Sequence, residues 1–128
     1  MKNLILDTNI FARLIVKNVS SQLEISRQLF KEIEKGKIKG WVSILVIDEL
    51  IWVLENYYRI ERNLYLPQIL NLLALKNISI IEVKKTIIIK ILREMESTSM
   101  DFTDLYLVGI AGDKKIISFD KDLKKLAA

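Results

Sequence analysis

The sequence predicts an α/β protein, a three-layer α/β/α sandwich around a parallel sheet of four to five strands. Three observations lead to this prediction. Short apolar runs recur along the chain, and longer segments with helical periodicity separate them. The first of these runs consists of Leu and Ile without polar alternation, as in strands that are buried on both faces. Strands that alternate with helices are typical of a parallel sheet with helices on both sides.

The first quarter of the chain contains one strand and two helices. Asn3-Leu4-Ile5-Leu6 is a short buried strand that ends at Asp7. Residues 9–16 have the pattern of a short helix. Ser21-Gln22-Leu23-Glu24 has the pattern of a capping box, and it predicts the start of a second helix that stops at Gly36.

The middle of the chain repeats this order. Ile38–Val42 is the second expected strand. Ser43 is a good N-cap for a strongly apolar helix that runs to about Tyr58. Pro67 fits the first turn of a further helix, which ends near Leu75, because proline needs no backbone N–H partner there.

The last third supplies two more strands. Ile78–Val83 is the third, and Lys84–Glu96 has a helical pattern although it contains a β-branched run. Asp101 caps a short helix that runs to about Gly112. Ile116-Ile117-Ser118-Phe119 is the fourth strand, and it ends at an aspartate before a last helix.

Composition limits the chemistry that this chain can carry out. The 128 residues predict a single domain, residues 1–128, with no linker and no repeat. There is no Cys and no His, which excludes disulfides, thiolate sites and the commonest zinc ligand. No stretch has the length and character of a membrane span, so we expect a soluble, cytoplasmic protein. The net charge of +4 permits a polyanionic partner without requiring one.

Four acidic residues are expected at one edge of the sheet. Asp7 and Asp120 each follow a strand, Glu49 lies in the second turn of the helix after the second strand, and Asp104 lies in the first turn of a later helix. In parallel sheets the strand C-termini and the helix N-termini share an edge, where ligands usually bind. Asp48 neighbours Glu49, and periodicity alone does not decide which of the two faces that edge.

Clustered carboxylates need a proton or a cation to relieve their repulsion. With no His available, oxygen-only ligands favour a hard ion such as Mg²⁺ or Mn²⁺, which can activate water for attack on a phosphodiester. A simpler reading is also open, because an aspartate after a strand is often only the N-cap of the next helix. This second reading applies to Asp7, to Asp101 with Asp104, and to Asp120 with Asp122.

Four segments in this order resemble the PIN-domain family, and most of all the VapC toxins of type II toxin–antitoxin pairs. They are "LILDTNIF", "VSILVIDELIWVL", "DFTDLYLVGIA" and "IISFDKDL". The second segment has a Ser six positions before its acid, matching Ser43 and Glu49. The segment Gly109–Lys115 is shorter than is usual in the family, and Leu105 replaces a common Ala.

The resemblance implies a PIN-like fold and a metal-dependent endoribonuclease. It implies that Mg²⁺ or Mn²⁺ is held by four acids, which would be the catalytic and metal-binding residues: Asp7, Glu49, Asp104 and Asp120. The supporting residues would be Asn9, Ser118, Asp101 and Asp122. Further implications are an RNA substrate, a homodimer and a VapB-like antitoxin that covers the acidic edge.

Two alternatives remain open, and a third is disfavoured. The chain could be a housekeeping RNA-processing PIN nuclease, or a catalytically silent PIN domain that binds RNA or a protein. A phosphatase of the haloacid dehalogenase type also has a strand followed by Asp-x-Asp, but it needs further motifs, and only six residues follow Asp122.

Overall fold

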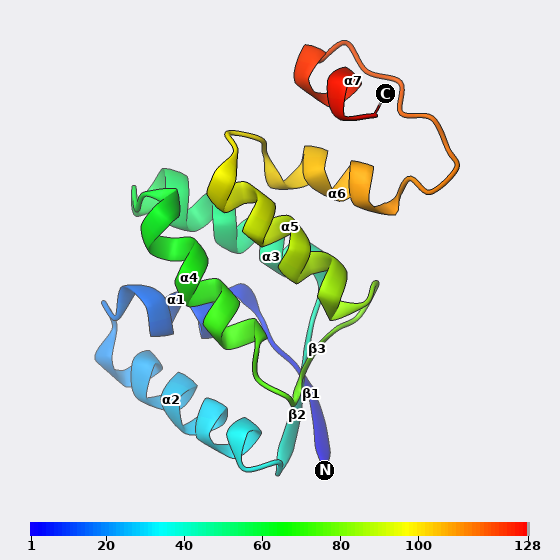
Figure 1. Ribbon diagram of the computed structural model, residues 1–128. Helices are drawn as coiled ribbons and strands as arrows, with labels where there is room; N and C mark the ends of the chain where they lie inside the picture. Colours follow the sequence, from blue (N-terminus) through cyan, green and yellow to red (C-terminus); the bar gives the residue numbers. More distant parts are fainter. Residues whose placement is uncertain (128) are drawn as a thin grey trace.

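A parallel sheet and a set of helices make up the protein, as seen in a computed structural model that describes residues 1–127. The strands β1 (Lys2–Ile5), β2 (Ile38–Val42) and β3 (Ile78–Ile80) lie in the order β1-β2-β3, and both pairings are parallel (Figure 1). Ile5 pairs with Trp41, and Val42 pairs with Ile80. The α/β class and the parallel sheet are therefore confirmed.

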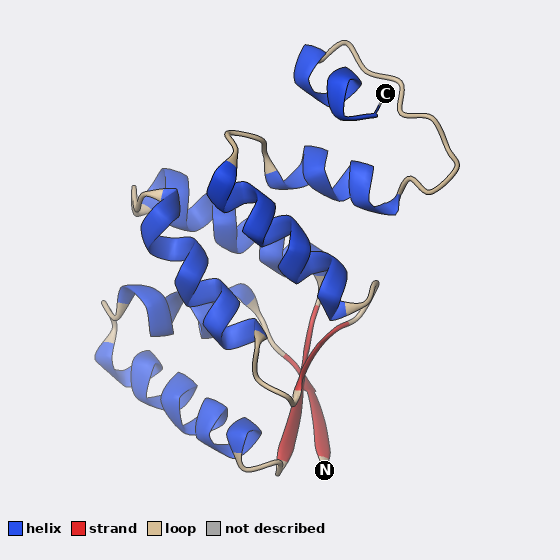
Figure 2. Ribbon diagram, viewed as in Figure 1, coloured by secondary structure: helices blue, strands red, loops and turns tan. Residues whose placement is uncertain are grey.

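Helices fill the connections between the strands and the whole C-terminal part, and they lie mainly to one side of the sheet (Figure 2). They are α1 (Thr8–Val16), α2 (Ser20–Glu34), α3 (Ile44–Trp52), the π-helical turn η1 (Val53–Tyr57), α4 (Arg62–Leu73), α5 (Lys85–Ser97), α6 (Phe102–Ile110) and α7 (Lys121–Ala127). Within residues 1–127, no helix combines the length and apolar character needed to cross a membrane.

The hydrophobic core lies between the helices and one face of the sheet. Leu6, Val42, Ile78 and Ile80 are buried on that face, and Gly40 lies among them. A Cβ at Gly40 would come within 2.8 Å of the Ile78 side chain and 2.9 Å of the Leu6 side chain. Glycine at this position thus allows close packing around the middle of the sheet.

The opposite face of the sheet is less covered than a three-layer sandwich implies. Ile5, which ends β1, is 75% exposed, and Trp41 beside it is partly exposed. Asn3 accepts a hydrogen bond from the Trp41 indole (2.9 Å), and Lys39 lies over the Trp41 ring. A polar and aromatic surface therefore occupies this face instead of a second apolar layer.

The expectation of four to five strands is wrong in number, because the described residues form three. Ile116–Phe119, expected as the fourth strand, has no strand pairing, and Ile117 and Phe119 are 91% and 102% exposed. The chain from α6 to α7 runs away from the sheet, and α7 returns to pack near α6 with Leu123 buried (Figure 1). This packing keeps the segment away from β1, whose outer edge remains unpaired among the described residues.

Several element boundaries also differ from expectation. The expected capping box at Ser21–Glu24 is absent, because α2 begins two residues earlier, with Val19 and not Ser21 at the N-cap, and has no side-chain cap. Pro67 lies inside α4 and not in its first turn, since the helix already begins at Arg62. Pro67 is exposed to solvent, and at an exposed position the loss of one backbone hydrogen bond of the helix destabilises the fold least. The helix after Ser43 changes to the wider π-helical turn at Val53.

Candidate functional site

The C-terminal edge of the sheet carries a polar residue after each strand. Asp7 follows β1, is exposed, and accepts a hydrogen bond from the Thr8 N–H (2.8 Å), so it caps α1. Ser43 follows β2 and accepts from the Leu45 N–H (3.1 Å), so it caps α3 as expected. Glu82 follows β3. Asp7 is therefore the N-cap of α1. Its position at a strand end is also compatible with a role as a metal ligand.

Glu82 also lies at the C-terminal edge of the sheet, and the sequence analysis did not predict it there. Its carboxylate accepts hydrogen bonds from the Ser43 hydroxyl (2.5 Å) and the Ile44 N–H (2.9 Å). The expected strand Ile78–Val83 placed Glu82 inside the strand. Since β3 ends at Ile80, Glu82 instead lies two residues beyond the strand, as Asp7 lies beyond Ile5. No signal in the sequence marked this position, because the end of β3 at Ile80 was not predicted.

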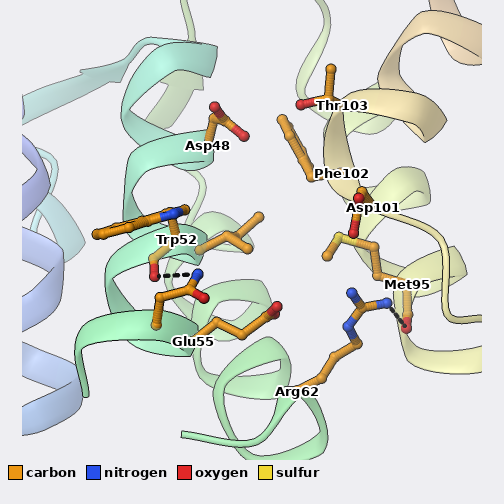
Figure 3. A pocket seen from close by; sticks show the side chains of 10 residues that line it. Asp48, Trp52, Glu55, Arg62, Met95, Asp101, Phe102 and Thr103 are labelled. Carbon is orange, nitrogen blue, oxygen red and sulfur yellow. Dashed lines mark hydrogen bonds between the residues drawn. The ribbon is translucent and has the colours of Figure 1, made fainter. Parts of the chain in front are cut away.

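The two neighbouring acids of α3 are both exposed. Asp48 lines a cleft of about 380 Å³ between α3, η1 and the segments that join α5 to α6, and Glu49 is not among the residues that line it. In Figure 3 the Asp48 side chain points across this cleft toward Thr103 at the start of α6. The two acids thus face different surroundings, as two consecutive helical positions require.

Arg62 forms the far wall of the same cleft. Its guanidinium donates from one nitrogen, Nη1, to the carbonyl oxygens of Thr98 (3.1 Å) and Met100 (3.0 Å) and to that of Met95 (3.3 Å), the last of which is drawn in Figure 3. These carbonyls belong to the end of α5 and the chain that follows it. Arg62 therefore holds the connection that leads into α6.

A group of four acids surrounds the first turn of α6. Burial raises the pKa of the partly buried Asp104, and the nearby charges of Asp120, Asp101 and Asp122 raise it further. Asp120 caps α7 by accepting from the Leu123 N–H (2.9 Å), and its own N–H donates to the Ser118 hydroxyl oxygen (2.9 Å). The carboxylates of Asp101, Asp104, Asp120 and Asp122 form what we call the α6 acid group.

The expected site residues are thus only partly brought together. Asp104, Asp120, Asp101 and Asp122 share the α6 acid group, whereas Asp7 and Glu49 are not among the charges that raise the Asp104 pKa. Asn9 is exposed and lines a shallow groove between α1 and α2. In residues 1–127, no three acidic side chains converge closely enough to enclose a metal ion.

The donors that are present suit a hard cation. All are carboxylate oxygens, which are the preferred ligands of Mg²⁺ and Mn²⁺. A carboxyl group whose pKa is raised by three negative neighbours is one whose charge a divalent ion would stabilise. The ligand type of the α6 acid group therefore suits such an ion. Asp7 and Glu49, the other two acids of the expected set, lie outside this group.

Comparison with known proteins identifies one family. The model of the PIN domain family matches residues 4–128, which is nearly the whole chain. No curated protein and no solved structure matches the chain significantly.

Proposed function

The chain belongs to the PIN-domain family, whose members are generally metal-dependent nucleases, and on that premise we propose that it is a metal-dependent endoribonuclease of the VapC-like toxin type. The observation that carries this proposal is the match to the PIN domain family over residues 4–128, and the proximity of Asp104 to Asp101, Asp120 and Asp122 supports it. Burial and the neighbouring charges both disfavour the ionised form of Asp104, and a bound cation would favour it. Binding of Mg²⁺ or Mn²⁺ by a nuclease would account for the presence of several carboxylates at this position.

In this proposal Asp7, Glu49, Asp104 and Asp120 hold the ion. When bound, the ion supplies an activated water and neutralises the charge that develops on the phosphodiester. A carboxylate of the set accepts the proton of the attacking water. Ser118 orients Asp120, a role supported by the Asp120 N–H bond to its hydroxyl, and Asn9 supports Asp7.

Contacts with the RNA backbone would come from lysines near the α6 acid group. Lys114, Lys115 and Lys121 are exposed and lie on the chain that flanks Asp120. Lysine ammonium groups attract phosphates without reading the base sequence. The VapB-like antitoxin and the homodimer belong to the same proposal and rest on the family resemblance alone.

One observation favours a second candidate, a catalytically silent PIN domain that binds RNA or a protein. Asp7 and Glu49 lie outside the group that perturbs Asp104. A domain in which the four acids never assemble would bind its partner without cutting it. The test below separates the two candidates.

The test compares two neighbouring acids of α3 in an RNA-cleavage assay with saturating Mn²⁺. Glu49→Gln keeps the size and hydrogen-bonding capacity of the side chain but removes the charge, so we expect cleavage to be abolished. Asp48→Asn is the matched control, and its rate should stay within about three-fold of wild type, as for a residue outside the reacting centre. Melting curves confirm that both variants fold.

Three results would count against the proposal. A dead Asp48→Asn together with an active Glu49→Gln would overturn the assignment of the second ligand. If the wild type cuts no RNA and arrests no growth when expressed without a partner, the silent domain is the better description. If cleavage persists unchanged in EDTA, the metal requirement is wrong.

A further inference from the structure

Glu82 joins the end of one strand to the start of the helix after its neighbour. Its two carboxylate oxygens accept from Ser43 Oγ (2.5 Å) and from Ile44 N (2.9 Å), and both donors belong to the first turn of α3. The Ile81 N–H donates to the Val42 carbonyl oxygen (3.0 Å) immediately beside them. The ends of β2 and β3 and the N-terminus of α3 are therefore held together at one point.

These contacts are strong for hydrogen bonds near solvent. A negative charge at a helix N-terminus is favoured by the helix dipole, and charge-assisted bonds are shorter and stronger than neutral ones. Desolvation acts to raise the pKa of Glu82, but the bonds from the Ser43 hydroxyl, the Ile44 N–H and its own backbone N–H together lower it. The carboxylate is therefore ionised near neutral pH, with both oxygens engaged in the cap.

The position of α3 matters because this helix carries Glu49. From Ile44 to Glu49 the helix rises about 7.5 Å, so a tilt of about 10° at its N-terminus moves Glu49 by roughly 1 Å. Displacements of that size are large for a group that must meet an ion. Ile47, Leu50 and Ile51 are buried, so we expect the helix to stay folded when its cap is removed.

We propose that Glu82 is a positioning residue that sets the direction of α3 and thereby places Glu49 for metal binding. This inference rests on the proposed function, in which Glu49 is a ligand. Glu82 lies in none of the four segments that carry the family resemblance. It acts through Ser43 and the first turn of α3, because both of its oxygens are already used there.

The experiment measures the cap and the metal separately in the full chain. In the metal-free protein, amide hydrogen exchange at Ile44 reports the cap directly. Titration with Mn²⁺, followed by calorimetry, reports metal affinity without any need for cleavage. The variants are Glu82→Ala, Glu82→Gln as the conservative change, and Glu96→Gln as the control, since Glu96 is exposed on α5 and carries the same charge.

In Glu82→Ala we expect faster exchange at Ile44 and Mn²⁺ binding weakened about tenfold, the usual loss when a group that orients a ligand is removed. The kcat for RNA should fall while KM changes little, because backbone contacts with RNA are untouched. Glu82→Gln should recover part of both losses, since an amide oxygen can still accept from the Ile44 N–H. Glu96→Gln should behave as wild type.

Other outcomes would contradict either the role of Glu82 or the proposed function. If Glu82→Ala is folded and binds Mn²⁺ as tightly as wild type, Glu82 has only a structural role and this inference fails while the nuclease proposal stands. An equal loss in Glu96→Gln would show a general charge effect and has the same consequence. If the wild type neither binds Mn²⁺ nor cuts RNA, the proposed function fails, and this inference fails with it.

Discussion

Replacing Arg62 by Met is expected to destabilise the protein by about 2–3 kcal/mol. The Nη1 group of Arg62 carries two hydrogens, so at most two of the carbonyls of Met95, Thr98 and Met100 are well bonded at one time. Each bond to a charged donor contributes about 1.5–3 kcal/mol, and we take the lower end because Arg62 is partly exposed. Its charge at the end of α5 adds a smaller dipole term.

The assay is thermal and urea unfolding of the metal-free protein at pH 7. For a domain of this size, about 2–3 kcal/mol corresponds to a melting temperature lower by roughly 6–15 °C. Met keeps the apolar stem of Arg62 to about the position of its Nε, so the loss reports mainly the guanidinium. Arg62→Lys keeps the charge but not the reach of the guanidinium, and should lie between Met and wild type.

Arg93→Met is the matched control, because Arg93 is exposed on α5 and should change stability by less than about 0.5 kcal/mol. If Arg62→Met and Arg93→Met melt at the same temperature, the carbonyl contacts contribute nothing and the reasoning is refuted. A real loss should extend to function, since Arg62 holds the connection that leads to Asp101 and Asp104. Cleavage by Arg62→Met below its melting temperature should therefore be slower than wild type.

Two further predictions follow from the sheet and the α6 acid group. Because the pKa of Asp104 is raised in the folded state, its ionisation destabilises the fold, so Asp104→Asn should melt higher than wild type in metal-free buffer at pH 7. That advantage should vanish as the pH falls below the ordinary aspartate pKa, and a lower melting temperature at pH 7 would contradict it. Gly40→Ala should destabilise by about 1–3 kcal/mol in urea unfolding, since its Cβ would meet two side chains closer than 3 Å. Gly109→Ala, with its nearest contact at 3.5 Å in α6, should instead be stabilising, and equal effects would refute the packing argument.

The local features of the fold were well predicted from the sequence. The strand after residue 2, the cap at Ser43 and the helix that begins near Lys85 depend on neighbouring residues, and such patterns are visible in a single sequence. The same holds for Asp7, whose place after a strand predicted a position at the sheet edge. Local chemistry was sufficient for these elements.

The features that depend on distant partners were less predictable. Ile116–Phe119 has the composition of a buried strand, but pairing also requires an available neighbour, and the packing of Leu123 in α7 near α6 keeps this segment outside the sheet. Glu82 was missed for a similar reason. Its role depends on where β3 ends and on the Ser43 hydroxyl 39 positions away in sequence, and no local pattern gives either.

Assembly of the acids is the least predictable feature. Asp101, Asp104, Asp120 and Asp122 lie near one another because the starts of α6 and α7 bring them together, whereas the sequence predicted a common edge for Asp7, Glu49, Asp104 and Asp120. The distance from Asp7 or Glu49 to that neighbourhood depends on how α6 and α7 pack on the rest of the chain. That packing is decided by many weak contacts, which a single sequence does not rank.

The unpaired edge of β1 has a consequence for handling the protein. The N–H groups of Lys2 and Leu6 point to β2, where they bond the carbonyls of Lys37 and Trp41, so those of Asn3 and Ile5 point outward. An outward row of this kind is a template for a strand of another molecule, and Phe119 lies fully exposed in an apolar segment of the same chain. The strand is only four residues long and begins with a lysine, which limits self-association at low concentration. Pairing through this edge is therefore expected to rise with protein concentration.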